Sequence, residues 1–120
     1  GSGDKAISVG EGSVIIAKDI SIKNSNIGIA SKDDSLVILD DVKIDNVNIG
    51  LAAYIKKIEY GSPKIEASNI EILNFKHEFV SDLESEIFIN ERKIANINCK
   101  KNVETCYFLE NPIQIQKLSN

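Results

Sequence analysis

Few side chains in this 120-residue chain have the chemistry of a catalytic centre. Acid–base or nucleophilic catalysis requires several such groups to converge on one reacting atom. The chain has one histidine, His77, one arginine, Arg92, and one candidate carboxylate pair inside a predicted loop, Asp33-Asp34. None of them stands in a catalytic motif. We therefore predict no catalytic residues, no cofactor and no metal site, and a non-catalytic protein is favoured over an enzyme.

Charged and tyrosine side chains gather in segments that separate short apolar runs. The longest such segment, 54–63, carries two tyrosines, which can stack on a sugar ring or anchor a protein contact. Shorter segments lie at 10–13 and 32–35 and could help to bind a cation or a sugar. The alternative is that these charges are simply solvated, as is usual in loops. The candidate ligand-binding residues are Glu11, Lys32, Asp33, Tyr54, Lys56, Lys57, Glu59 and Tyr60.

An internal repeat predicts the elements that position these segments. Residues 6–17 resemble residues 28–39, which lie 22 positions later. After six extra residues the match resumes at a spacing of 28, and a degraded fourth copy follows after another 22. Sequence similarity at a fixed period is typical of stacked repeat architectures. We predict three short strands per copy, which in the first copy lie near 7–9, 14–17 and 20–22.

Apolar residues recur at equivalent positions of the four copies and alternate with polar residues within each copy. This period of two is typical of strands and not of helices. Because all copies run in the same chain direction, equivalent strands should pair in parallel, about 4.8 Å apart. The four apolar columns are Ile7, Ile29, Leu51 and Phe79; Ile15, Val37, Ile65 and Ile87; Ala17, Leu39, Ala67 and Ile89; and Ile22, Ile44, Ile72 and Ile94.

Polar residues mark two corners of each copy. Asparagine and aspartate tolerate the left-handed conformation that a sharp corner needs, and stacked amides can hydrogen-bond from copy to copy. The first corner has Asn24, Asn46, Asn74 and Asn96, and the second has Asp19, Asp41 and Asn69. Together the pattern predicts an all-β, right-handed parallel β-helix of about four coils, the handedness following from the usual crossover rule.

The three-strand copies with an Asn corner resemble the right-handed parallel β-helix (pectin-lyase-like) superfamily. The phrases at 6–13, 27–35 and 51–61 are similar to bacterial β-helix-repeat proteins of undefined activity, and the resemblance covers roughly residues 5–98. It implies the fold, and it is compatible with an extracytoplasmic or cell-surface setting. Enzymes of this superfamily commonly cleave acidic polysaccharides, but their grouping of carboxylates with a histidine and a basic pair is not visible here.

Outward-pointing residues of the predicted second strand are aliphatic in the first two copies and mostly charged later. Adjacent exposed aliphatics mark a surface that is normally covered. The covers that fit are the C-terminal tail, a second copy of the chain, or a domain outside it, and we favour the first two equally. The candidate interface residues are Val14, Ile16, Leu36 and Ile38.

Three parts are predicted along the chain. Residues 1–3 are interpreted as an expression scar, 4–98 as the β-helix coils, and 99–120 as a C-terminal cap or tail that contains both cysteines. Whether Cys99 and Cys106 are bonded stays open. The net charge of −4 gives no basis for nucleic-acid binding, and no apolar run is long enough to span a membrane.

The function that these observations favour is a non-catalytic β-helix module of a larger bacterial protein, binding carbohydrate or a protein partner. One alternative is a polysaccharide-acting enzyme, a lyase or hydrolase fragment, that uses the acidic loop edge. The other is a purely structural or assembly element, with homo-oligomers as its natural form. The residues alone do not identify the ligand, the parent protein or the oligomeric state.

Overall fold

The computed structural model describes residues 3–55, 59–82 and 84–94, and this part of the chain is all β. All six strands lie in one sheet and follow one another in chain order. The first four pairings are parallel, and the last is antiparallel. The predicted all-β class and parallel pairing are confirmed. The strands are β1 (Gly3–Val9), β2 (Val14–Lys32), β3 (Leu36–Tyr54), β4 (Lys64–Ser81), β5 (Glu86–Ile89) and β6 (Arg92–Lys93).

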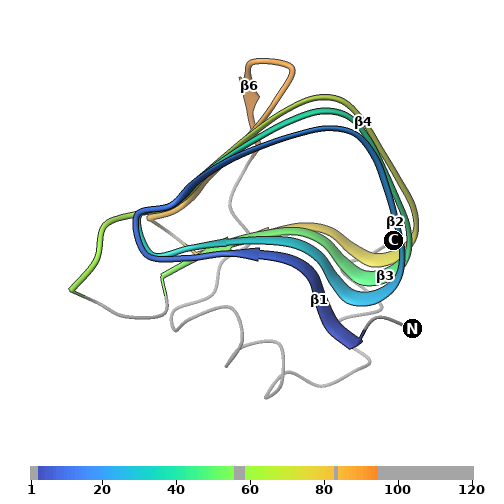
Figure 1. Cartoon of the computed structure of the whole chain (residues 1–120), viewed down its shortest axis with the longest axis horizontal. Helices are drawn as coiled ribbons and strands as arrows, with labels where there is room; N and C mark the ends of the chain where they lie inside the picture. Colours follow the sequence, from blue (N-terminus) through green and yellow to red (C-terminus); the bar gives the residue numbers. More distant parts are fainter. Residues whose placement is uncertain (1–2, 56–58, 83, 95–120) are drawn as a thin grey trace.

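Strands β2, β3 and β4 are far longer than predicted. They contain 19, 19 and 18 residues, whereas strands in globular proteins usually have 3 to 10. Each bends at the same places as its neighbours, so the three lie over one another along a shared path (Figure 1). The prediction of separate strands at 14–17 and 20–22 is therefore wrong, because both segments belong to the continuous strand β2.

Single residues in the left-handed conformation let the strands bend without losing their pairing. These residues form two sets, one at each corner of the strands. The φ angles lie between 53° and 59° in the first set and between 54° and 59° in the second. Asparagine and aspartate reach this region at low cost because their short polar side chains can hydrogen-bond locally. The first set is Asp19, Asp41 and Asn69, and the second is Asn24, Asn46 and Asn74.

Side chains at these corners interact from strand to strand. Asn46 Nδ2 donates to Asn24 Oδ1 at 2.6 Å, as a ladder of like residues predicts. Asn74 Nδ2 instead donates to Asp45 Oδ1 at 2.7 Å, so the ladder shifts by one residue at β4. At the other corner, a hydrogen bond that the protonated Asp19 carboxyl donates to the Asp41 side chain, together with the nearby negative charges of Asp41 and Asp40, raises the pKa of Asp19.

The register agrees with the predicted spacing of the copies. Val14 pairs with Leu36, Leu36 with Lys64, and Lys64 with Glu86, which are offsets of 22, 28 and 22 residues. The six extra residues therefore lie in the connection between β3 and β4, and they leave the pairing on both sides of it intact. Like residues consequently lie over one another, as the columns predicted.

The main apolar core lies on the inner side of the bent strands. It includes residues of all four predicted columns, with Val37, Leu39 and Ile44 almost fully buried. Ile15 is the exception, because 38% of it is exposed. Strand β1 pairs with β2 between Ser25 and Ser31. No described strand therefore pairs with Ile15 on the side that faces away from β3. A second buried cluster contains Ile27, Ala30, Ile49, Ala52, Tyr54 and Val80.

Two glycines let neighbouring strands approach closely at the bend near residue 28. A Cβ at Gly28 would lie 2.7 Å from the carbonyl oxygen of Gly50 and 2.9 Å from Ile44 Cγ2. A Cβ at Gly50 would likewise lie 2.7 Å from the carbonyl oxygen of Glu78. Real Cβ atoms do not come this close to a backbone atom, so a larger residue would push the strands apart.

We expect Gly50→Ala to lower the free energy of unfolding by about 2–4 kcal/mol, because the added methyl group meets backbone and cannot be accommodated by a rotamer change. Glu78→Ala is the matched control. Glu78 occupies the equivalent place in β4 and is exposed, so its replacement should change the stability by about 0.5 kcal/mol at most. Urea denaturation measures both, and equal stability of the Gly50→Ala variant and the wild type would contradict this packing.

Candidate functional site

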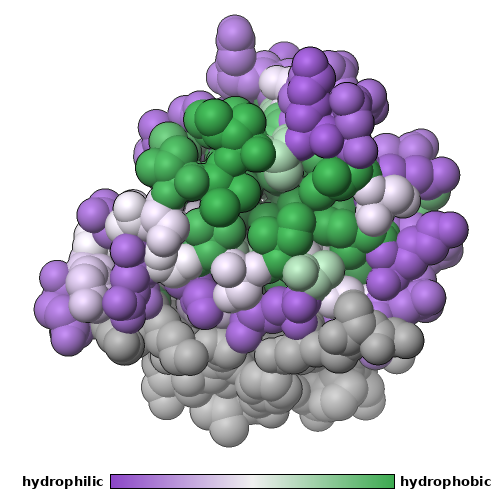
Figure 2. Space-filling view, in the orientation of Figure 1, coloured by the Kyte–Doolittle hydropathy of each residue, from purple (hydrophilic) through white to green (hydrophobic). Residues whose placement is uncertain are grey.

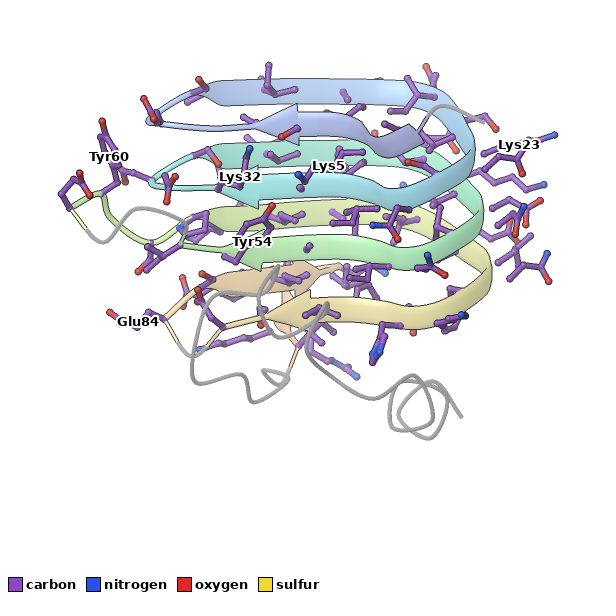
Figure 3. The ribbon with its side chains drawn as sticks, turned by 90° about the horizontal axis from the view of Figure 1, so that it is seen from below. Lys5, Lys23, Lys32, Tyr54, Tyr60 and Glu84 are labelled. Atoms are coloured by element: carbon purple, nitrogen blue, oxygen red, sulfur yellow. The ribbon has the colours of Figure 1, made fainter. Side chains whose placement is uncertain are left out.

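The turn that connects β1 to β2 lies beside the turn that connects β2 to β3, at one end of the strands. Both central residues of each turn have positive φ, at Glu11-Gly12 and at Asp33-Asp34, as in a type I′ turn. Gly12 N donates to the carbonyl oxygen of Asp33 at 3.0 Å, which links the two turns directly. Tyr60 and Glu84 lie at the same end of the molecule (Figure 3).

The described candidates for ligand binding differ in their exposure to solvent. Glu11, Glu59 and Tyr60 are exposed, and Lys32 is half-buried. Asp33 is only 3% exposed, and Tyr54 is completely buried. Neither of these last two side chains is presented to solvent, so their role as ligand-binding residues stays a prediction.

Tyr54 is buried because it packs in the second apolar cluster. It is the last residue of β3 and not a loop residue, and it pairs with Lys32, so both project from the same side of the sheet (Figure 3). The remaining two candidates, Lys56 and Lys57, lie outside the described residues.

Buried hydroxyl and carboxylate groups form hydrogen bonds in the β2–β3 turn and in the connection between β4 and β5. Ser31 Oγ lies 2.6 Å from Ser35 Oγ, which donates to the carbonyl oxygen of Val9 at 3.2 Å. Asp82 accepts from Ser85 Oγ at 2.5 Å and from the amide of Ile55 at 2.7 Å. Buried polar groups need such partners, and these side chains are therefore explained by structure without a ligand.

His77 is a buried residue that continues an apolar column. It is 6% exposed and pairs with Ile49, which pairs with Ile27 in the same column. Burial lowers the pKa of His77, since the apolar surroundings disfavour the charged imidazolium. Within the described ranges, no three or more His, Cys, Asp or Glu residues are grouped so that they could hold a metal ion.

The outer face of the sheet carries two columns of outward-pointing side chains that cross β2 to β5. We call these columns the outer strip. Its part on β2 is strongly apolar and exposed, with Val14 60% and Ile16 74% accessible to solvent. Leu36 and Ile38 on β3 are half-buried. The strip consists of Val14, Leu36, Lys64 and Glu86, and of Ile16, Ile38, Glu66 and Phe88.

The part of the outer strip on β4 and β5 is charged and has one aromatic ring. Lys64 Nζ lies 3.5 Å from Glu66 Oε2 and 5.2 Å from the centroid of the Phe88 ring. The ammonium group thus contacts both a carboxylate and the electron-rich face of a ring. The strip therefore changes from aliphatic to mixed charged and aromatic within four neighbouring strands.

A groove of about 690 Å³ adjoins this charged part of the strip. One side is formed by the turn that joins β5 to β6, where Asn90 and Glu91 both have positive φ. Asn69 N donates to Asn90 Oδ1 of this turn at 3.3 Å, and Asn69 Nδ2 donates to Asp40 Oδ1 at 2.9 Å. The groove is lined by Ile38, Leu39, Asp40, Lys64, Glu66, Ala67, Ser68, Asn69, Phe88 and Glu91.

Sequence reasoning identified only part of this groove. It placed Ile38 on the outer face and Asn69 at a corner, but it assigned no role to Asp40 or Glu91. The corner pattern around Asn69 was visible in the sequence. The turn at Asn90-Glu91 is an Asn-containing two-residue connection between short strands, which is a recognisable hairpin signal.

Comparisons with family models, with curated proteins and with solved structures found no match for this chain. None of the described residues belongs to a helix long and apolar enough to cross a membrane. The groove and the outer strip therefore have to be interpreted from their own geometry.

We expect the stability of the protein to fall as the pH is lowered through 6.5. The pKa of His77 is lower in the folded state than its ordinary value of 6.5, so the unfolded chain binds the proton more readily. The full contribution of His77 to the stability is then present above pH 6.5. It decreases as the pH is lowered from 6.5 to the folded-state pKa. Urea denaturation at pH 7.5 and 5.5 measures this loss.

His77→Leu is the control, because leucine continues the apolar column formed by Ile27 and Ile49. Its stability should change less between the two pH values than that of the wild type. An equal pH dependence in the two proteins would show that His77 is not the group responsible.

Proposed function

We propose that this chain is a right-handed parallel β-helix module of the pectin-lyase-like kind, and that it binds a protein partner without catalysing a reaction. The fold proposal is supported by parallel pairing at the repeat spacing and by the shared path of β2, β3 and β4. Strands that pair in parallel while returning along one path require a crossover, and crossovers are overwhelmingly right-handed.

The observation that carries the binding proposal is the exposure of aliphatic residues beside a groove. Ile16 is 74% exposed and lies next to Ile38, which also lines the groove. Contiguous exposed aliphatic surface is typical of protein–protein contact sites. Sugar sites usually present aromatic rings and polar groups, and Ile16 and Val14 supply neither. The outer strip therefore fits a protein partner better than it fits a carbohydrate.

The composition of the groove limits the kind of segment that could bind. Ile38 and Phe88 line the groove with apolar surface, and its charged lining residues are three carboxylates, Asp40, Glu66 and Glu91, against one ammonium group, that of Lys64. Lys64 is already paired with Glu66 and Phe88. A complementary segment would carry an aliphatic or aromatic anchor flanked by lysine or arginine, since opposite charges across an interface fix register and increase the association rate.

A selection of displayed peptides against the purified chain tests this proposal. We expect selected peptides to contain an apolar anchor next to basic residues, and to bind about tenfold or more weakly to Ile38→Glu and Phe88→Ala variants, because central anchors dominate binding energy. Tyr60→Ala is the matched control, because Tyr60 is exposed but lies outside the groove. Binding that is unaffected by Ile38→Glu and Phe88→Ala would contradict the proposed site.

Carbohydrate binding at the loop edge is a second candidate, favoured by the exposure of Tyr60. Its side chain is 38% exposed, and the neighbouring turns present the carboxylates of Glu11 and Glu59 to solvent. A glycan array would identify such binding, which should be lost in Tyr60→Ala and retained in Phe88→Ala. Cleavage of uronic-acid polymers, with or without Ca²⁺, would instead show that the protein is an enzyme and overturn both binding proposals.

A further inference from the structure

Within the described residues, no strand pairs with one edge of β2 along the segment Val14–Lys18. Strand β1 pairs with β2 only from Ser25 onward, and β3 occupies the other side. Three of the five most exposed large hydrophobic residues in the described ranges are consecutive on this segment: Val14 at 60%, Ile15 at 38% and Ile16 at 74%. An unpaired, apolar strand edge is a template for pairing with another strand.

The end of the molecule that contains this edge is apolar in its centre. Figure 2 shows the β1 and β2 end, where hydrophobic side chains form a continuous area with hydrophilic ones along much of its border. Ile15 is the member of its column that lacks a described strand above it, whereas Val37 and Ile65 below it are fully buried. The free edge is therefore accompanied by incompletely covered core.

Hydrogen-bond geometry shows which residues of the segment face the free edge. Leu36 N donates to the carbonyl oxygen of Ser13 at 2.9 Å. Because alternate residues of a strand bond to opposite sides, the backbone groups of Ile15 and Ala17 then point to β3, and those of Val14, Ile16 and Lys18 point to the free edge. The residues with free backbone groups are also those whose side chains point outward.

We propose that this edge pairs with the same edge of a second copy, antiparallel, about a two-fold axis at Ile16. The straight segment Val14–Lys18 lies between a turn and the corner at Asp19, and Ile16 is its central residue. An axis at Ile16 pairs it with itself, Val14 with Lys18 of the second copy, and Ile15 with Ala17 of the second copy. Every free amide and carbonyl of the segment then meets another one.

Side-chain direction fits the same register. Outward residues meet outward residues, and the inward Ile15 meets the inward Ala17, so the cores of the two copies become continuous. An axis shifted by half a residue would pair inward with outward side chains, which a sheet with one buried face does not tolerate. The pattern is thus self-complementary, as a two-fold interface requires. This inference concerns the free edge and does not depend on the groove.

Sedimentation equilibrium over a range of concentrations tests the proposal, with a dimer as the expected species. Ile16→Pro should raise the dissociation constant of the dimer roughly thirtyfold, because each copy loses one amide donor at the free edge. The β2–β3 pairing should persist, since proline is tolerated on edge strands when its missing N–H faces away from the ladder. Ile38→Glu, one strand further in, should leave the dimer unchanged while weakening peptide binding at the groove.

A nitroxide label at position 16 gives a second readout that does not depend on proline. In a background with Cys99→Ser and Cys106→Ser, labelled Ile16→Cys should show strong dipolar broadening, since hydrogen-bonded residues of an antiparallel pair have Cα atoms about 5.5 Å apart. The same label at Lys43, exposed on β3, should show none. A monomer at every concentration, assemblies that grow beyond a dimer, or absent broadening at position 16 would overturn the proposal.

Discussion

In-register parallel pairing of β2, β3 and β4 is the constraint on which the rest of this structure depends. Pairing each residue with its equivalent in the next strand places isoleucine over isoleucine and asparagine over asparagine. The members of a column therefore share one environment, because the side chains above and below each member determine its surroundings. Aliphatic columns gain from burial, and amide columns gain hydrogen bonds between strands.

Corners and turns adapt the chain to this constraint. Single left-handed residues bend the strands while the pairing continues, and larger irregularities lie in the connections between them. The two groups of buried polar side chains, around Ser31 and around Asp82, secure these connections. The composition of the outer strip is consequently free to vary, because its side chains are not fixed by the core and can differ from one strand to the next.

Much of the fold could be predicted from the sequence. Residues of one column are buried together, so they are similar in type and appear in the sequence as a repeat. The pairing of Val14, Leu36 and Lys64 follows directly from the spacing. Strand lengths could not be predicted in the same way, since the corner at Asp19 reads as a break in the pattern although it does not interrupt pairing. Phe79 and Ile87 were correctly placed in apolar columns despite the weaker match of the last copy.

The candidate site was less predictable for a physical reason. Tyr54 looks like a loop residue because its segment is rich in charge, but its orientation is set by Lys32 above it. The groove depends on the turn at Asn90-Glu91 and on side chains from three strands, and such convergence depends on three-dimensional distances. Local sequence patterns predict burial and turns well, but they predict contacts between side chains that are distant in the sequence poorly.

The raised pKa of Asp19 has a consequence for how such a chain could grow. Its carboxylate lies beside that of Asp41 because equivalent residues overlie one another, and identical charges therefore accumulate along a column. The third member of the column is Asn69, whose amide donates to Asp40 and introduces no further charge. Duplication of a unit can extend neutral columns without such repulsion, whereas each carboxylate added to an ionised column adds to it. Lengthening of the protein by tandem duplication would thus select for amides at this corner.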